Sequence, residues 1–145
     1  MPGTWKSSYL LNLVLVAKAN GEVRPIEVLF LSRCRSKVDG NHRTLADAIM
    51  RSYWEDGCRT GSLISDEATL RDMIIMAMAD GERSAEEQAV VSRFIDAARI
   101  PPQRVEALLR EAADRFNEEM RAVGEANEVR VGRLGMRQDA PTAPP

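Results

Sequence analysis

The chain has 145 residues, 44% of them hydrophobic and 29% charged, and its 20 basic and 22 acidic side chains give a formal net charge of −2. This composition is ordinary for a soluble globular protein long enough to bury one core. The near balance of charge excludes a global field that would attract nucleic acid or an anionic membrane, so we expect no specific nucleic-acid partner. The two cysteines, Cys34 and Cys58, are too few for a disulfide framework, which favours a reduced, cytoplasmic chain.

The first predicted helix runs from about residue 6 to residue 19 and is apolar on nearly every side. Its run from Tyr9 to Ala17 resembles a secretory leader, but Leu70 to Ala79 has the same character in mid-chain, where no leader can lie. The run is also far shorter than the ~20 residues that cross a bilayer. We therefore expect a buried core helix and no membrane span.

Two shorter helices are predicted next. Pro25 suits the first position of a helix because its missing N–H would be unpaired there. Thr44, with Asp47 three residues later, resembles the start of another helix. A loop is expected over residues 55–62. The apolar faces that we expect to be buried are Ile26, Leu29, Phe30, Cys34 and Val38 on the first of these helices, and Leu45, Ala48, Ile49 and Tyr53 on the second.

Three helices are predicted in the second half. The first, capped by Ser65 or Asp66, is apolar nearly all round, so we expect it to pack against the first helix of the chain at the centre. The next opens with a capping box of Ser84 and Glu87. After a break at residues 100–102, the last helix has a clear period of apolar residues and is predicted to end at Gly124. We expect one helical domain over residues 1–124 and a disordered Pro-rich tail over 125–145.

One turn sequence occurs twice, sixty residues apart. Residues 79–87 read ADGERSAEE and residues 19–27 read ANGEVRPIE. The Ala, the Gly and both spaced Glu residues are in register. Self-similarity at a fixed offset indicates one supersecondary unit used twice. The predicted fold is therefore an all-α, compact bundle of about six to seven helices, built from two related helical-hairpin halves.

The acidic residues of these turns have two interpretations. In the first, Gly21 and Gly81 end helices, while Glu27 and Glu87 cap the next helix. This interpretation does not explain Asp80, which faces the negative end of a helix dipole. In the second, hard oxygen donors hold a divalent cation such as Ca²⁺ or Mg²⁺. Its candidate ligands at the second turn are Asp80, Glu82 and Glu87. The corresponding residues of the first turn, Asn20, Glu22 and Glu27, form a second and weaker copy of this candidate site.

An apolar helix, an Ala-Asp-Gly-Glu turn, a Glu at the next helix start and a second copy of this motif resemble the TerB-like domains of tellurite-resistance proteins and of the co-chaperone DjlA. The resemblance covers about residues 10–116. It implies a helical bundle with two related halves, metal-binding acidic residues at the turns, and a role in bacterial stress response or protein assembly. Asp80 and Glu87 match the family's acidic pair and Glu27 matches the first copy, whereas Asn20 stands where the family has Asp.

Other chemistry has less support in the sequence. His42 is the sole histidine and lies in a polar turn, so a multi-histidine zinc site is excluded. Cys58, beside Arg59, is the candidate for a reactive thiol with a lowered pKa. We therefore expect a non-catalytic binding or adaptor module with an unidentified protein partner. The alternatives are a small hydrolase or thiol enzyme using Cys58, or a structural subunit of a homo-oligomer.

Overall fold

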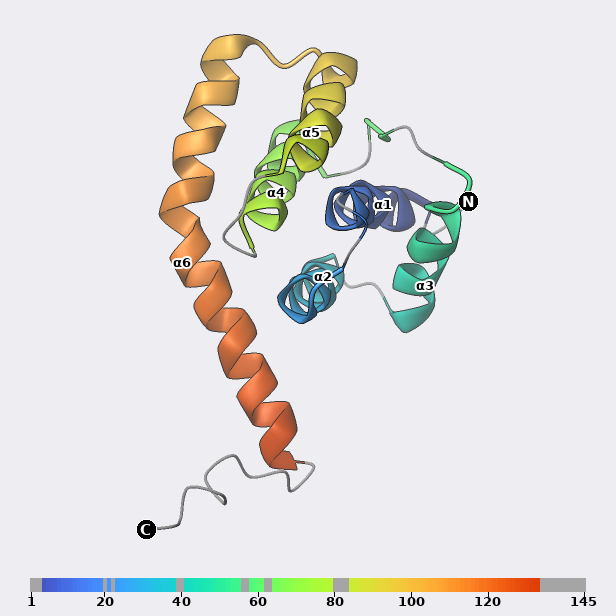
Figure 1. Ribbon diagram of the computed structural model, residues 1–145, viewed down its shortest axis with the longest axis vertical. Helices are drawn as coiled ribbons and strands as arrows, with labels where there is room; N and C mark the ends of the chain where they lie inside the picture. The colour runs from blue at the N-terminus through green and yellow to red at the C-terminus, as the bar shows by residue number, and fades with distance from the viewer. Residues whose placement is uncertain are drawn as a thin grey trace.

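The computed structural model describes residues 4–19, 21, 23–38, 41–55, 58–61, 64–79 and 84–133. All the regular structure in these ranges is α-helical (Figure 1), which confirms the predicted all-α bundle. None of the helices there is long and apolar enough to cross a membrane. The six helices are α1 (Thr4–Lys18), α2 (Pro25–Lys37), α3 (His42–Arg51), α4 (Asp66–Met78), α5 (Ala85–Ala98) and α6 (Pro102–Arg133).

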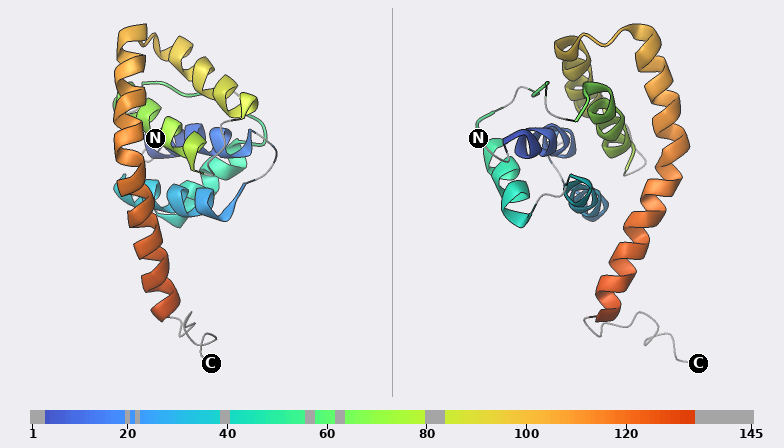
Figure 2. Two further views of the ribbon diagram at one scale, coloured as in Figure 1. Left: turned by 60° about the vertical axis from the view of Figure 1, so that its left-hand side comes forward. Right: turned by 180° about the vertical axis from the view of Figure 1, so that it is seen from behind.

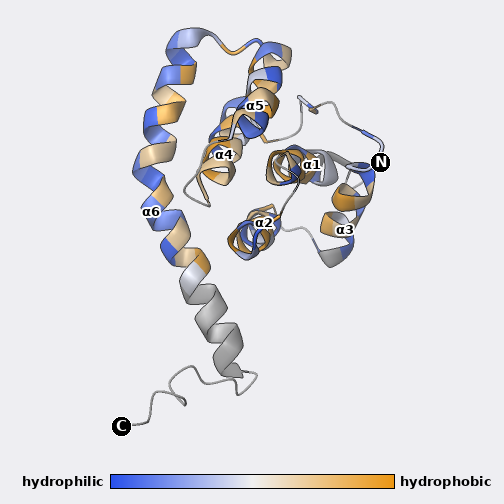
Figure 3. Ribbon diagram, in the orientation of Figure 1, coloured by the Kyte–Doolittle hydropathy of each residue, from blue (hydrophilic) through white to orange (hydrophobic). Residues whose placement is uncertain are grey.

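Helices α1 and α4 form the centre of the bundle, as the sequence predicts. They pack against each other, and each is surrounded by further helices: α2 and α3 cover α1, while α5 and α6 cover α4 (Figures 1 and 2). Hydropathy follows this arrangement: the coloured part of α6 carries many hydrophilic residues, whereas the central helices are more apolar (Figure 3). The buried hydrophobic residues of the two central helices are Tyr9, Leu10, Leu11, Leu13, Val14, Val16 and Ala17 on α1, and Leu70, Met73, Ile74, Ile75, Met76 and Ala77 on α4.

The helix starts depend on short polar side chains. Ser65 Oγ accepts a hydrogen bond from Ala68 N–H at 3.1 Å, and Ser84 Oγ accepts one from Glu87 N–H at 3.0 Å, as capping residues do. The start predicted at Thr44 is wrong. Asn41 is the N-cap of α3, and its Oδ1 accepts the Thr44 N–H at 3.0 Å.

Helix α3 departs from the sequence prediction in a second way. Leu45 and Ala48 pack in the core, but Ile49 is 38% exposed and Tyr53 is 72% exposed. The prediction that Ile49 and Tyr53 belong to the buried face is therefore wrong. A short helix that is apolar on more than one side gives no sequence signal of which side meets the core.

Helix α6 begins after a left-handed residue and is longer than predicted. Arg99 has φ 56° and caps α5, so the chain reverses before Pro102. Gly124 does not end the helix, which continues to Arg133, because a single glycine inside a helix costs only about 1 kcal/mol relative to Ala. Residues 134–145 lie outside the described residues, and disorder there stays a prediction.

Candidate functional site

The two duplicated turns join equivalent helices: the first joins α1 to α2, and the second joins α4 to α5. At the first turn Gly21 has φ 87°, a left-handed conformation that favours glycine. Its N–H donates to the Lys18 carbonyl at 2.9 Å and so satisfies one of the last carbonyls of α1. The predicted role of Gly21 as a helix-ending residue is confirmed, whereas Gly81 lies outside the described residues.

Glu27 and Glu87 occupy the same place in the two hairpins. Each is the third residue of its helix, and an oxygen of each accepts the backbone N–H of the capping residue: Arg24 N–H to Glu27 Oε1 at 2.7 Å, and Ser84 N–H to Glu87 Oε1 at 3.1 Å. The Ser84 hydroxyl also donates to Glu87 Oε1 at 3.1 Å. The predicted capping role is confirmed for both residues.

Burial distinguishes these two glutamates from ordinary capping residues. Both side chains are 0% exposed, whereas carboxylates are rarely fully buried unless they are paired with other groups. An exposed Gln or Glu would cap the helix equally well. The two equivalent positions therefore share complete burial as well as the cap.

The other four candidate ligands, Asn20, Glu22, Asp80 and Glu82, lie outside the described residues. Among the residues that are described, no three His, Cys, Asp or Glu side chains are grouped to hold a metal ion. The described part of each turn thus contributes one hard oxygen donor of the kind that Ca²⁺ and Mg²⁺ prefer. The donor chemistry fits such a cation, and further ligands would come from Asp80 and Glu82.

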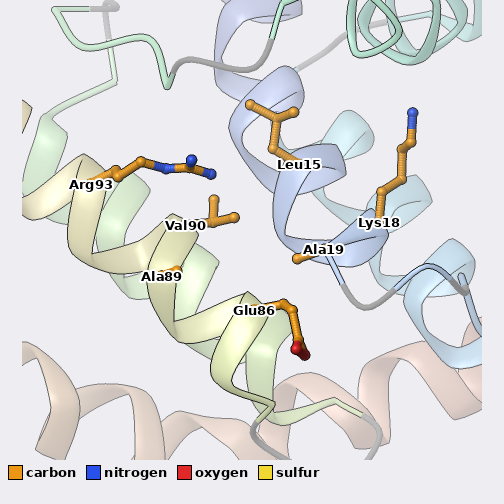
Figure 4. A pocket seen from close by; sticks show the side chains of 7 residues that line it. All are labelled: Leu15, Lys18, Ala19, Glu86, Ala89, Val90 and Arg93. Atoms are coloured by element: carbon orange, nitrogen blue, oxygen red, sulfur yellow. The ribbon is translucent and has the colours of Figure 1, made fainter.

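A groove of about 360 Å³ lies between the end of α1 and the start of α5 (Figure 4). Val90 and Arg93 extend from α5 toward Leu15 on α1, Glu86 lies at the other end beside Ala19, and Lys18 points away from α5. The groove therefore has an apolar floor with a cation near one end and a carboxylate near the other. Since Glu86 immediately precedes the buried Glu87, the groove borders the second turn.

Cys58 does not have the environment of a reactive thiol. The side chain is half-buried, and its Sγ lies 3.6 Å from the Val90 carbonyl. Burial raises the pKa of the Cys58 thiol, and the opposing charge comes from Arg93. The neighbouring Arg59, expected to activate the thiol, instead forms an ion pair with Glu55. The prediction of a lowered thiol pKa is therefore wrong.

The loop that carries Cys58 is fixed to the central helix by Asn12. This buried amide donates through Nδ2 to the Arg59 carbonyl at 2.8 Å and accepts the Arg59 N–H through Oδ1 at 2.7 Å. The polar residue that interrupts the first apolar run in the sequence thus pairs both backbone groups of one loop residue.

Sequence reasoning missed a buried polar network between α1, α2, α4 and α6. Tyr9 Oη donates to Asp72 Oδ2 at 2.5 Å, and Lys37 Nζ lies 3.6 Å from both Asp72 Oδ1 and Glu119 Oε1. Arg33 Nε donates to Glu119 Oε2 at 2.8 Å. The signal was present, because Asp72 is an acid directly before the apolar second half of α4. Asp72 also pairs with the adjacent Arg71, but nothing in the local sequence identifies its partners Tyr9 and Lys37, which lie far along the chain.

Burial and charge in this network shift the pKa values of the groups in it and beside it. Burial raises the pKa of Tyr9 well above its usual range and raises the pKa of Cys34, which lies beside it, to about 12. At Glu119 burial acts in the same upward direction, but the Arg33 hydrogen bond and the Lys37 charge lower its pKa overall. We interpret the cluster as an attachment that holds α6 to the bundle.

Comparison of the chain with protein-family models, with curated proteins and with solved structures finds no match.

Proposed function

We propose that this chain is a non-catalytic binding module in which the second acidic turn holds a divalent cation. The observation that carries this proposal is the matched, complete burial of Glu27 and Glu87 at the starts of α2 and α5. Glu27 and Glu87 both have interactions in the described structure beyond the printed cap, and a carboxylate is also an oxygen donor of the kind that Ca²⁺ and Mg²⁺ prefer. A cation at the turn would add to these interactions and to the cap.

In this proposal Glu87, Asp80 and Glu82 hold the ion at the second turn. The first turn has Asn20 where the second has Asp80, so it carries less charge and binds more weakly. The bound ion would fix the start of α5, and with it the position of α5 against α1 across the groove bordered by Glu86. That groove would receive a short segment of a protein partner, with an apolar side chain between an acidic and a basic group.

A role in bacterial stress response, including tellurite resistance, follows only from the resemblance of the duplicated turn to TerB-like domains. We retain it as part of the proposal. The burial and raised pKa of Cys58 are the reason to prefer a binding module over a thiol enzyme.

Thermal unfolding with and without metal tests the cation. Gln can keep the cap while removing the charge, so Glu87→Gln separates the two roles of this side chain. Wild type at a Ca²⁺, Mg²⁺ or Mn²⁺ concentration of 100 Kd should gain about 2.7 kcal/mol, which is a rise in Tm of several degrees. Glu87→Gln and Asp80→Asn should lose most of this rise.

The matched control is Glu118→Gln, which removes one carboxylate from an exposed position on α6. It should keep the full metal-induced rise in Tm. Equal rises in wild type and Glu87→Gln would show that the cation, if it binds, does not use this turn. The proposal would then be wrong.

A further inference from the structure

Helix α3 presents apolar side chains on the side opposite to its buried face. Ile49 is 38% exposed, Met50 55%, Tyr53 72% and Trp54 65%. Successive residues of an α-helix are about 100° apart around its axis, so the exposed Ala46 lies on the same side as these four residues. Single exposed apolar residues are common on protein surfaces, but a continuous stripe with two aromatic rings marks an interaction site. We call these five residues the α3 stripe.

The aromatic end of the α3 stripe is held in place. Its backbone continues the helical turn, because Tyr53 N–H donates to the Met50 carbonyl and Trp54 N–H to the Arg51 carbonyl, both at 3.1 Å. The Lys18 ammonium lies 4.0 Å from the centre of the Tyr53 ring. Side chains fixed before binding lose little entropy when a partner covers them.

We propose that the α3 stripe is the interface of a two-fold symmetric dimer, in which it is covered by the same stripe of a second copy of this chain. In a two-fold dimer the same patch must complement itself. Two copies of α3 that run antiparallel, with the axis between Ala46 and Met50, satisfy this requirement. The small Ala46 of one copy then faces the long Met50 of the other.

Charge and shape are complementary in the same arrangement. Arg43 is exposed at the N-terminal end of the stripe, and Tyr53 and Trp54 lie at its C-terminal end. Antiparallel pairing places Arg43 of each copy near the C-terminal end of the other stripe, where the Tyr53 ring already faces Lys18 of its own chain and the Trp54 ring is exposed. A guanidinium over an aromatic face is a favourable cation–π contact, and the two-fold axis repeats it at both ends.

The charges around the stripe argue against a membrane or a nucleic acid as the occupant. Arg51 and Arg59 both form ion pairs with Glu55, and Asp47 lies one helical turn from Arg43. This balance gives no basic cluster of the kind that anionic lipid headgroups or phosphates require. An apolar stripe with only Lys18 and Arg43 as neighbouring cations, and with Asp47 between Arg43 and the aromatic end, fits a second copy better.

The size of the α3 stripe predicts a weak dimer. Its four large residues expose roughly 500 Å² per chain, if a large side chain has about 150–250 Å² of surface. A stable interface buries about 800 Å² per partner. We therefore expect a dissociation constant of the dimer in the micromolar range, so that the chain is monomeric in dilute solution.

Sedimentation of the full chain from about 5 to 500 µM tests the dimer, since weak interfaces respond over this range. Wild type should change from monomer to dimer. Met50→Glu places a charge at the centre of the stripe and should weaken dimerisation at least tenfold, and Arg43→Glu should weaken it several-fold. Leu109→Glu, a matched change at a partly exposed apolar residue on α6, should leave it unchanged, with circular dichroism confirming that each variant is folded.

Three results would overturn the proposal. The first is a wild-type monomer at 500 µM. The second is equal dimerisation of Met50→Glu and Leu109→Glu. The third is a monomer that binds phosphatidylcholine–phosphatidylglycerol vesicles and loses this binding in Trp54→Ala, which would assign the stripe to a lipid surface.

Discussion

At the scale of single residues, the two buried glutamates connect the sequence repeat to the proposed function. Their spacing after the glycines was readable from the sequence, and so was their capping role. Their burial was not, because it depends on how neighbouring helices close over the turns. A glutamate at the third position of a helix can cap it while its side chain stays exposed. Only the three-dimensional structure therefore shows that Glu27 and Glu87 are buried, unlike an ordinary capping glutamate.

Replacing Glu87 by Ala should cost more stability than replacing it by Gln. Ala removes the hydrogen bond to Ser84 N–H and leaves a buried donor and a cavity, for which we expect a loss of about 1–3 kcal/mol in the free energy of unfolding. Gln keeps the cap, so in metal-free buffer its cost should be smaller. Urea unfolding measures both, and equal losses would mean that the cap contributes nothing.

The two cysteines should differ in reactivity. Cys34 is 0% exposed and burial raises the pKa of its thiol to about 12, so it should stay unmodified in the native state. Cys58 is half-buried with a raised pKa and should react slowly with a thiol reagent at pH 8. The Cys58→Ser variant should then not react with the thiol reagent while it is folded. After unfolding, it should show one reactive thiol per chain, that of Cys34. Rapid labelling of Cys34 in the folded protein would contradict this burial.

At the scale of elements, the pattern of apolar residues predicted each of the six helices that the structure describes, but their ends and long-range contacts could not be predicted as well. Apolar runs without a polar side identify α1 and α4 as central helices, since neither can face water. The N-cap of α3 was misplaced because Asn41 and Thr44 are both good capping residues. The partners of Asp72 and Glu119 are set by tertiary packing, which one sequence does not reveal.

The attachment of α6 should depend on pH. The pKa of Glu119 is lowered in the folded protein, so its contribution to stability is fully present above the pKa of an unfolded carboxyl group. This contribution is lost as the pH falls through the pKa of Glu119 in the folded protein. Between pH 5 and pH 3 the free energy of unfolding of wild type should fall more steeply than that of Glu119→Gln. Parallel pH profiles would show that the ion pairs with Arg33 and Lys37 add no stability.

Truncation of α6 should show where the domain ends. Val123 is 1% exposed and Glu119 is in the polar network. Removing residues 125–145 keeps both, so we expect a change within about 0.5 kcal/mol. Removing residues 119–145 deletes both and should cost at least about 2 kcal/mol. A large loss from the shorter deletion would mean that the second half of α6 is part of the core.

At the scale of the whole molecule, the account describes two helical hairpins with their first helices side by side and an acidic turn after each. The repeat predicted this organisation because a duplicated turn requires a duplicated helix pair. The surface was harder to predict, since the exposed stripe on α3 has the composition of a core face. If the dimer forms, each assembly carries two grooves and two pairs of turns, and a partner with two binding segments would gain affinity through avidity.

The central claim is that the second turn binds a divalent cation through Glu87. Calorimetric titration of chelator-treated protein with Ca²⁺ tests it most directly, because it counts the ions and assigns them to a turn. We predict one tighter ion per chain that is lost in Glu87→Gln and retained in Glu27→Gln. Unchanged binding in Glu87→Gln, or no binding of Ca²⁺, Mg²⁺ or Mn²⁺ to the wild-type protein, would contradict the claim.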